Sequence, residues 1–415
     1  MTFLLPPTFP YFPIIFPLNL PPMSAASRRH FLKTAGLSLA ALPVAASAYG
    51  ALFQEKEYLV YVGTNVAGAD QDTIFLYRLH PVTGQLTPVR GQRGGIQPTY
   101  LTLDQQRRFL YAVSETTEFR GAPSGGVSTF RIDPKTGDLT LLGQQASGGG
   151  APCYLSLDHT GKAALVANYG GGNVSLLPIQ PNGQLAAAAA LDQHQGTGPH
   201  PNQTGPHAHC LLPAPDNRFA FAVDLGTDTV YCYELRSAQG QLTRTATPAF
   251  TTKPGAGPRH LTFHPNGRLA YLINELNSTL TALAYDTATG SLRELQTLST
   301  LPAGFTQNNS CADVHVSPDG KFVYGSNRGH DSIVVFRIDA KTGQLTLVQH
   351  VSTQGKTPRN FSLDPAGRLL LVANQNSNTL VTYHVDRRTG QLTPTGHTAT
   401  VPTPMIVQIV SDFSR

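Results

Sequence analysis

Short apolar segments separated by turn residues recur along this chain with a period of about 50 residues. In a representative unit, Pro258 to Phe263 and Arg268 to Asn274 flank a Pro-Asn-Gly turn at Pro265 to Gly267, and Leu280 to Tyr285 follows after a polar loop. Segments of this length, bounded by Gly, Pro and Asn, predict β-strands. Each unit is therefore predicted to consist of strands, with no amphipathic helix between them.

Every unit ends in a turn of the form Thr-Gly-(Gln/Asp/Ser)-Leu, or a close relative of it, which leads into a short fourth strand. The seven copies close at Leu86, Leu139, Leu185, Leu242, Leu292, Leu345 and Leu392. Repeats of this length with four strands each are typical of propeller blades and not of a globule with a single core. The fold class predicted here is all-β.

The number of blades follows from the two ends of the repeat region. Six complete units begin near Pro98, Pro152, Pro206, Pro258, Ser310 and Pro358. The first region, Tyr58 to Val89, lacks an opening strand, whereas Pro404 to Val410 looks like an opening strand with nothing after it. We therefore expect a seven-bladed β-propeller of four antiparallel strands per blade, closed by pairing of the C-terminal strand with the N-terminal blade, which removes an open sheet edge.

The N-terminal residues resemble a twin-arginine export signal. Ser27 to Lys33 reads Ser-Arg-Arg-His-Phe-Leu-Lys, an Ala/Leu-rich run follows, and Ala46-Ser47-Ala48 resembles a cleavage site. We expect residues 1–48 to be an extension and signal that is removed, and residues 49–415 to be the propeller domain. Translation starting at Met23 would give a signal of ordinary length, so Met1 and Met23 remain alternative starts.

This signal predicts a periplasmic protein that meets the twin-arginine export machinery. A membrane anchor is the weaker interpretation of the leader, because five prolines between Pro6 and Pro17 would interrupt a spanning helix. The signal carries Arg28, Arg29 and Lys33 and no acidic residue, so its removal lowers the formal charge from +5 to 27 − 25 = +2. A nearly neutral domain with no Lys/Arg run excludes a nucleic-acid stripe. We expect a monomer that does not bind membranes once the signal is gone.

Four cysteines lie in the repeat region, at Cys153, Cys210, Cys232 and Cys311. Because Cys153 and Cys210 open neighbouring blades, a bridge between them is one interpretation, and buried free thiols are the other. None of the four has the spacing of a metal site. His207 and His209, two residues apart on one strand, would point the same way, but no third ligand accompanies them. We therefore predict no metal and no cofactor.

Strands one and two of a blade are antiparallel, so the start of the first and the end of the second meet at one rim of the ring. Aligning the blades on their turns places charged and polar side chains at this rim, which we call the charged rim. They are His209, Arg259 and Arg359 at strand starts, His260, Asp313 and Asn360 one residue later, and Glu115, Glu275 and Arg328 at the ends of second strands.

These charges predict a site for an acidic ligand. Three guanidinium groups that point into one space repel one another and lose hydration, which costs free energy unless an anion or a carboxylate pairs with them. Arg suits bidentate recognition of a carboxylate or phosphate, Glu275 can orient one such fork, and His209 can exchange a proton near neutral pH. The alternative interpretation is a salt-bridged rim that only fixes neighbouring blades.

Four segments in order on successive blades carry a resemblance to a known family: Gly257 to His260, Ile273 to Ser278, Ser326 to Ser332, and Thr357 to Asn360. They resemble the propeller lactonase family, which contains the propeller type of 6-phosphogluconolactonase and the fungal carboxymuconate lactonizing enzyme. The likeness runs from about Tyr58 to the C-terminus. By matching motif, the resemblance implies a catalytic set of His209, Arg259, Glu275 and Arg328, with His207 as the alternative histidine.

The resemblance implies a carboxylic-ester hydrolase that opens a lactone without a cofactor. In this hypothesis Arg259 and Arg328 hold the acidic group and the developing oxyanion, His209 is the general base, and Glu275 orients Arg259 or shares the proton transfer. His207, His260, Asp313, Arg359, Asn360 and Glu115 complete the expected substrate-binding set. An exported protein would not meet cytosolic 6-phosphogluconolactone, so an aldonolactone, uronolactone or other acidic lactone suits it better. The alternatives are an envelope propeller that binds glycan or protein, and a cyclase of the muconate type.

Overall fold

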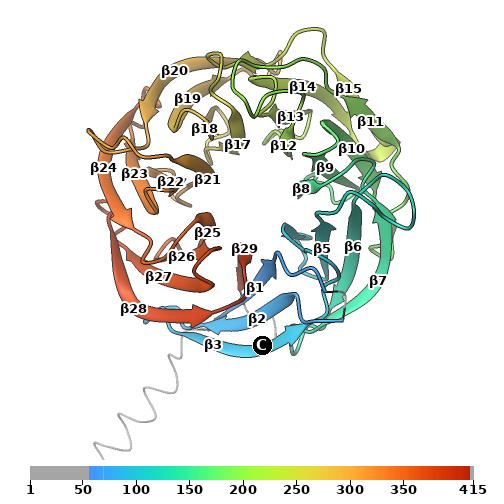
Figure 1. The fold of residues 1–415 in the computed structure, drawn as a ribbon, viewed down its shortest axis with the longest axis horizontal. Coiled ribbons are helices and arrows are strands. Elements are labelled where there is room, and N and C mark those ends of the chain that lie inside the picture. The colour runs from blue at the N-terminus through green and yellow to red at the C-terminus, as the bar shows by residue number, and fades with distance from the viewer. Residues whose placement is uncertain (1–55, 69, 412–415) are drawn as a thin grey trace, which may run out of the picture. The chain divides into compact units, whose positions relative to one another are not determined.

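The computed structural model describes residues 56–68 and 70–411, and these residues form a ring of seven β-sheets arranged like blades about a central axis (Figure 1). Four sheets of the ring, each given from its innermost strand outward, are β29 (Pro404–Ser411), β1 (Tyr58–Thr64), β2 (Ile74–Leu79), β3 (Leu86–Gln92); β4 (Leu101–Leu103), β5 (Phe109–Ser114), β6 (Gly126–Ile132), β7 (Leu139–Ala146); β8 (Pro152–Leu157), β9 (Ala163–Asn168), β10 (Asn173–Pro178), β11 (Ala190–Gln193); and β17 (Pro258–Phe263), β18 (Leu269–Asn274), β19 (Thr279–Tyr285), β20 (Leu292–Ser299).

The other sheets are β12 (Ala208–Pro213), β13 (Phe219–Asp224), β14 (Thr229–Arg236) with β15 (Gln241–Arg244) and β16 (Phe250–Thr251); β21 (Ser310–Val316), β22 (Phe322–Arg328), β23 (Ser332–Ile338), β24 (Leu345–Ser352); and β25 (Pro358–Leu363), β26 (Leu369–Asn374), β27 (Thr379–Val385), β28 (Leu392–Thr400). All pairings are antiparallel, and the 3-10 helix η1 (Ser237–Gln239) precedes β15.

The predicted all-β, seven-bladed architecture is confirmed. The unit used to define the repeat matches closely, because β17 spans Pro258–Phe263 and β20 begins at Leu292. Two outer strands depart from the pattern. The chain after Leu185 makes only an isolated bridge with Ile179 before β11 begins at Ala190, and one outer strand is divided into β15 and β16, which both pair with β14.

The ring closes through its two ends, as the incomplete first repeat predicted. Strand β29 pairs antiparallel with β1 along its length, with Tyr61 opposite Gln408 and Val62 opposite Val407. Figure 1 shows β29 beside β1 at the centre of the ring. This pairing gives the first blade its fourth strand and leaves no open edge between the chain ends.

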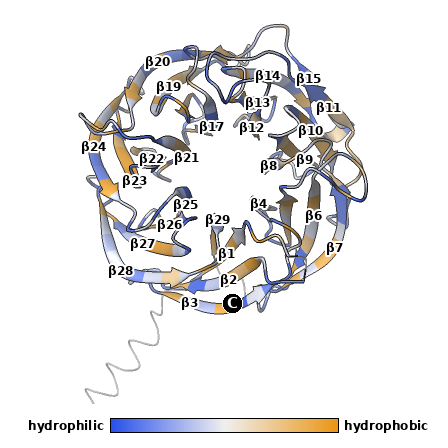
Figure 2. Cartoon of the chain, viewed as in Figure 1, coloured by the Kyte–Doolittle hydropathy of each residue, from blue (hydrophilic) through white to orange (hydrophobic). Residues whose placement is uncertain are grey.

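Apolar residues form layers between neighbouring sheets. One layer joins Phe221 and Val223 of β13 to Leu272 of β18, and comparable layers lie between the other neighbouring pairs. Hydrophilic residues are frequent along outer strands such as β28 (Figure 2), where one residue is buried and the others are partly buried or exposed. Each sheet packs both of its faces against neighbouring sheets, which fixes its orientation in the ring. The first strands of all blades therefore begin at one common rim.

The repeated Thr-Gly turn holds neighbouring blades together. The hydroxyl of Tyr111 donates a hydrogen bond to the carbonyl oxygen of Gly183 at 2.9 Å, and that of Tyr324 donates to Gly390 at 3.2 Å. Gly390 has a φ of +80°, and a Cβ there would lie 2.3 Å from the ring of Phe322. The glycine of the repeat is therefore required both by its left-handed backbone and by the close approach of the previous blade.

The predicted signal at residues 1–48 and the two alternative starts lie outside the described residues. Within 56–68 and 70–411, no helix is long and apolar enough to cross a membrane. All four cysteines are buried and free. Of the two interpretations that the sequence allowed, the structure therefore has free thiols and no bridge between Cys153 and Cys210.

Candidate functional site

The residues that open each blade sit at interruptions of the β-ladder. In the sheet of β17, Pro258 pairs with Asn274 and His260 with Ile273, so Arg259 has no partner opposite it. The same shift leaves Cys153, His209 and Arg359 unpaired in their blades. An extra residue of this kind bends a strand and re-aims its side chain. The repeated bulge thus explains why these four side chains gather at the charged rim.

Glu275 lies between two guanidinium groups from neighbouring blades. Its Oε2 is 2.9 Å from Nε of Arg259 and 2.9 Å from Nη2 of Arg328. Arg259 is only 2% exposed and also donates to the carbonyl oxygen of Ala312, while Arg328 donates to the carbonyl oxygen of Cys311 at 2.9 Å. The salt-bridged rim considered from the sequence is therefore present for these residues, and it holds two cations in fixed positions.

Burial governs the protonation of this cluster. Burial and the neighbouring Arg328 lower the pKa of Arg259 to about 10, so the guanidinium stays charged at neutral pH. Burial opposes ionisation of Glu275, but Arg328 and Arg259 hold the pKa of its carboxyl below the ordinary value. The cluster is therefore ionised throughout the physiological range.

A second polar cluster lies beside the first and is centred on Asp313. Its carboxylate lies 2.8 Å from Nδ1 of His260 and 2.9 Å from Nε2 of His315, and Asn360 donates to it through Nδ2. His260 in turn lies 3.3 Å from Nη1 of Arg259 through its Nε2. Burial and Arg259 lower the pKa of His260 to about 4, so this ring is neutral at physiological pH. Asp313 therefore orients a neutral imidazole against Arg259.

His209 is buried among aromatic and sulfur groups. Its ring centre lies 5.2 Å from that of His260 and 5.4 Å from that of Tyr169, and its Nδ1 lies 3.6 Å from Sγ of Cys153. Burial and the nearby Arg259 hold the pKa of His209 well below its ordinary value. The ring is thus a neutral hydrogen-bonding group, and a weaker base than the sequence alone suggested.

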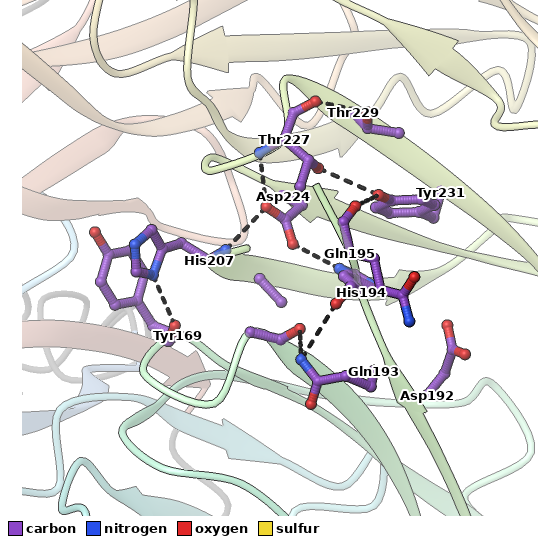
Figure 3. Close-up of polar contacts among 12 residues, drawn as sticks. Tyr169, Asp192, Gln193, His194, Gln195, His207, Asp224, Thr227, Thr229 and Tyr231 are labelled. Carbon is purple, nitrogen blue, oxygen red and sulfur yellow. Dashed lines mark hydrogen bonds and ion pairs between the residues drawn. The ribbon is translucent and has the colours of Figure 1, made fainter. Parts of the chain in front are cut away.

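His207 lies beside Tyr169 (Figure 3). Its ring stacks on Tyr169 with centres 4.4 Å apart, and its Nδ1 lies 3.0 Å from the carbonyl oxygen of the same residue. Its backbone N–H donates to Oδ1 of Asp224 at 2.9 Å. Of the two histidines that the motif left open, His209 is therefore the one that lies against His260, whereas the side chain of His207 stacks on Tyr169.

Glu115 and Arg359 face each other across the same rim. Oε1 of Glu115 lies 3.9 Å from Nη2 of Arg359, at the limit of an ion pair. Both residues line a small cavity of about 10 Å³. The remaining lining residues are Thr99, Tyr100, Cys153, Arg259, His260, Asn360 and Met405. Of the predicted site residues, five line this cavity, and ion pairs or hydrogen bonds join Glu275, Arg328 and Asp313 to them, whereas the side chain of His207 contacts Tyr169.

Comparison with known proteins identifies the family. Residues 59–409 match the model of the lactonase family with a seven-bladed β-propeller. The chain belongs to this family. It is 37% identical over 305 residues to 6-phosphogluconolactonase of Bacillus subtilis, covering 74% of this chain and 84% of the relative, and 36% identical over 272 residues to 6-phosphogluconolactonase of Formosa agariphila, covering 65% and 75%.

A solved structure has the same ring. The periplasmic gluconolactonase of Pseudomonas aeruginosa matches with a TM-score of 0.81 and 35% identity, covering 86% of this lactonase and 99% of that chain. The resemblance drawn from four short segments is confirmed, and so is the predicted class of enzyme, a carboxylic-ester hydrolase acting on lactones.

A much larger cavity, of about 1140 Å³, lies at the opposite face of this lactonase. Its lining includes the turns between strands one and two, such as those at Asp104 and Asp158. These carboxylates already cap their own turns, since Asp104 accepts from the backbone N–H of Phe109 at 2.7 Å and Asp158 from that of Ala163 at 2.8 Å. These two carboxylates of the larger cavity thus serve as turn caps, whereas the paired guanidinium groups belong to the charged rim.

One buried network, centred on His194, was not predicted from the sequence. Nδ1 of His194 lies 2.6 Å from Asp224, and its Nε2 lies 2.8 Å from the hydroxyl of Tyr233, so this side chain of the lactonase is fully enclosed. Because Asp224 also holds the backbone of His207 and of Thr227, the network fixes the long loop that precedes β12. Asp224 is the last residue of β13, the second strand of its blade. Its position at that strand end was the feature of the sequence that could have indicated the network.

Proposed function

We propose that this lactonase hydrolyses the ring ester of a sugar lactone, an aldonolactone or uronolactone, in the periplasm and without a cofactor. The observation that carries the proposal is the pair of guanidinium groups of buried Arg259 and partly exposed Arg328, which one oxygen of Glu275 holds beside a neutral His209. Ester hydrolysis passes through a tetrahedral intermediate whose oxygen bears a negative charge, and preorganised donors stabilise that charge in a dry site.

The charges at the rim favour a substrate with little charge of its own. Arg259, Arg328 and Arg359 contribute three positive charges, and Glu115, Glu275 and Asp313 contribute three negative ones, which leaves 3 − 3 = 0. A rim without excess charge suits an uncharged aldonolactone better than the carboxylate of a uronolactone. A phosphorylated lactone would bring about −2 in addition to the oxyanion. The charge balance therefore supports an aldonolactone most strongly.

In the proposed mechanism, the substrate carbonyl oxygen faces Arg259 and Arg328. Glu275 keeps both forks in place, and His260, oriented by Asp313, supports Arg259 through its Nε2. His209 stays neutral and hydrogen-bonds the substrate or a water at the rim. Arg359, Asn360 and His207 border the space that the sugar ring would occupy.

A panel of lactones tests the proposal. The full chain is assayed with a pH indicator against glucono-1,5-lactone, glucuronolactone and 6-phosphogluconolactone, each corrected for its uncatalysed opening. We expect turnover of the first two and weaker turnover of the phosphorylated compound. Arg259→Ala should lower kcat/KM by at least about 100-fold, the loss seen when one oxyanion donor is removed. Arg236→Ala, an exposed change on β14, serves as the control. No turnover of any lactone would leave a binding propeller as the better hypothesis, and consumption of a muconate would favour the cyclase.

The periplasmic location rests on the leader and on the named location of the Pseudomonas relative. Changing Arg28 and Arg29 to Lys should retain the protein in the cytoplasm, and cell fractionation measures this. Export of the double variant in normal amounts would contradict the twin-arginine route.

A further inference from the structure

Two polar groups in the small cavity beside Arg359 lack a partner among the described residues. Oε2 of Glu115 is buried and accepts no hydrogen bond, and the hydroxyl of Thr99, a residue only 4% exposed, also has none. Native structures leave very few buried polar atoms unsatisfied, and those that remain call for an explanation such as a bound water. Two such atoms around one cavity therefore indicate that the cavity receives a polar guest.

The size of the cavity limits that guest to one oxygen atom or a little more. Its volume of about 10 Å³ is close to the minimum that admits a single water molecule. A buried water is held by two to four polar partners. Glu115 supplies an acceptor and Thr99 a hydroxyl that donates or accepts, so the cavity offers a water the contacts it needs.

The cavity also lies where an attacking water would be useful. Arg259, which we propose to face the carbonyl oxygen of the lactone, forms part of its wall, together with Arg359 and His260. A water in the cavity thus lies next to Arg259, one of the two guanidinium groups that we propose to face the carbonyl oxygen. His209 does not line this cavity, and its Nδ1 faces the thiol of Cys153.

We propose that this cavity holds the hydrolytic water and that Glu115 is the general base that activates it, an inference that rests on the proposed lactonase function. The water oxygen bonds to the carbonyl carbon while its proton passes to Oε2 of Glu115. The carbonyl oxygen becomes the oxyanion held by Arg259 and Arg328. The bond from the carbonyl carbon to the ring oxygen then breaks, and the ring oxygen takes the proton from Glu115. One water is consumed, the open hydroxy acid leaves, and Glu115 is again a carboxylate.

The surroundings of Glu115 suit this role. The charged and titratable groups that line the cavity with it are Arg359, Arg259, His260, Cys153 and Tyr100. Burial raises the pKa of the Cys153 thiol, which therefore stays protonated, and the neutral His260 does not compete for the water proton. Glu115 supplies the carboxylate of this cavity, and its Oε2 accepts no hydrogen bond from another side chain.

The experiment compares Glu115→Gln with the unmodified full chain on two lactones, hydroxylated glucono-1,5-lactone and hydroxyl-free δ-valerolactone. The amide keeps the size of the side chain but cannot take the proton. We expect kcat to fall by about 10²- to 10⁴-fold on both substrates, the usual contribution of a general base, with KM changed less than about threefold. Glu118→Gln, an exposed change in the same loop, should leave both constants unchanged.

Two further variants separate catalysis from folding. Glu115→Asp keeps a carboxylate and should retain part of the activity, and Glu115→Ala should recover activity on addition of formate, which supplies a carboxylate to the vacated space. Thermal unfolding checks that each variant is folded. An increase in KM confined to the hydroxylated lactone, with kcat retained, would overturn the proposal and make Glu115 a contact for a sugar hydroxyl. Absence of turnover by the unmodified chain would instead refute the proposed function, and the role of Glu115 with it.

Discussion

Arg259 and Arg328 meet on a single oxygen atom, since Oε2 of Glu275 lies 2.9 Å from Nε of the first and 2.9 Å from Nη2 of the second. Arg259 belongs to β17 and Arg328 ends β22, so this one oxygen joins two neighbouring blades. The arrangement combines a structural role with the fixed placement of two cations beside each other. Stability and activity should therefore both depend on Glu275.

Glu275→Gln tests this dependence. We expect kcat/KM to fall at least about 100-fold, because neither fork is held for the oxyanion. The free energy of unfolding should fall by roughly 3–5 kcal/mol, the cost of leaving buried charges without their partner. Urea unfolding and the indicator assay measure the two effects. Glu234→Gln, at an exposed ion pair with Arg236, should change neither quantity.

Full activity in Glu275→Gln would show that the forks hold their positions through the carbonyl oxygens of Ala312 and Cys311 alone. Lost activity with unchanged stability would mean that Glu275 acts on the substrate and not on the blades.

The sequence was sufficient to place the charged rim because the repeat constrains it. Aligning turns gives the register of each hairpin, and the register assigns Arg259, Glu275 and Arg328 to one end of the ring. The ladder interruption at Arg259 and His209 could not be seen in this way, since a one-residue bulge leaves the spacing of the repeat unchanged.

Partners across blades were also beyond the sequence. The repulsion among three arginines predicted an acidic ligand. In the structure, however, Glu275 forms ion pairs with two of them, and Oε1 of Glu115 lies 3.9 Å from Nη2 of the third, Arg359. The buried contact of His194 with Asp224 links a loop to a strand end 30 residues later, and no local pattern encodes it. Such contacts depend on how neighbouring blades are rotated against each other, which is a property of the closed ring.

The pH dependence of activity should not report protonation of His209. Burial and Arg259 hold the pKa of this imidazole well below 6.5, so it stays neutral as the pH falls from 8 to 6. We therefore expect kcat/KM to show no inflection near 6.5 that belongs to His209, and NMR of labelled histidine should show a neutral ring at pH 6. An inflection near 6.5 that disappears in His209→Asn would contradict this environment.

Asp313 should contribute to acid unfolding. Burial opposes its ionisation, but His315 and His260 hold the pKa of the carboxyl below its ordinary value of 3.8. A carboxyl with a lowered pKa in the folded state contributes stability that is present above the unfolded pKa and is lost as the pH falls below it. Stability of the unmodified protein should therefore decrease below about pH 4.

Asp313→Asn lacks this contribution, so its stability should be lower at pH 7 and should decrease less between pH 4 and pH 3. Urea unfolding at pH 7, 4 and 3 measures the difference, with exposed Asp70→Asn as the control. Equal slopes for Asp313→Asn and the unmodified protein would show that other carboxyl groups govern acid unfolding.

Ring closure makes β29 a point on which the whole fold depends. Val407 is 1% exposed and lies opposite Val62 in β1, so Val407→Asp places a charge without a partner between the two chain ends. We expect a loss of at least about 3 kcal/mol in the free energy of unfolding, because a buried charge that is not paired costs several kcal/mol.

In hydrogen exchange, amides of β1 and β29 should lose protection before those of β18 and β22, since the ring opens where its ends meet. Thr398→Asp, an exposed change on β28, should leave exchange and stability unchanged. Uniform loss of protection around the ring would show instead that the seven blades unfold as one unit and that closure is not its weakest joint.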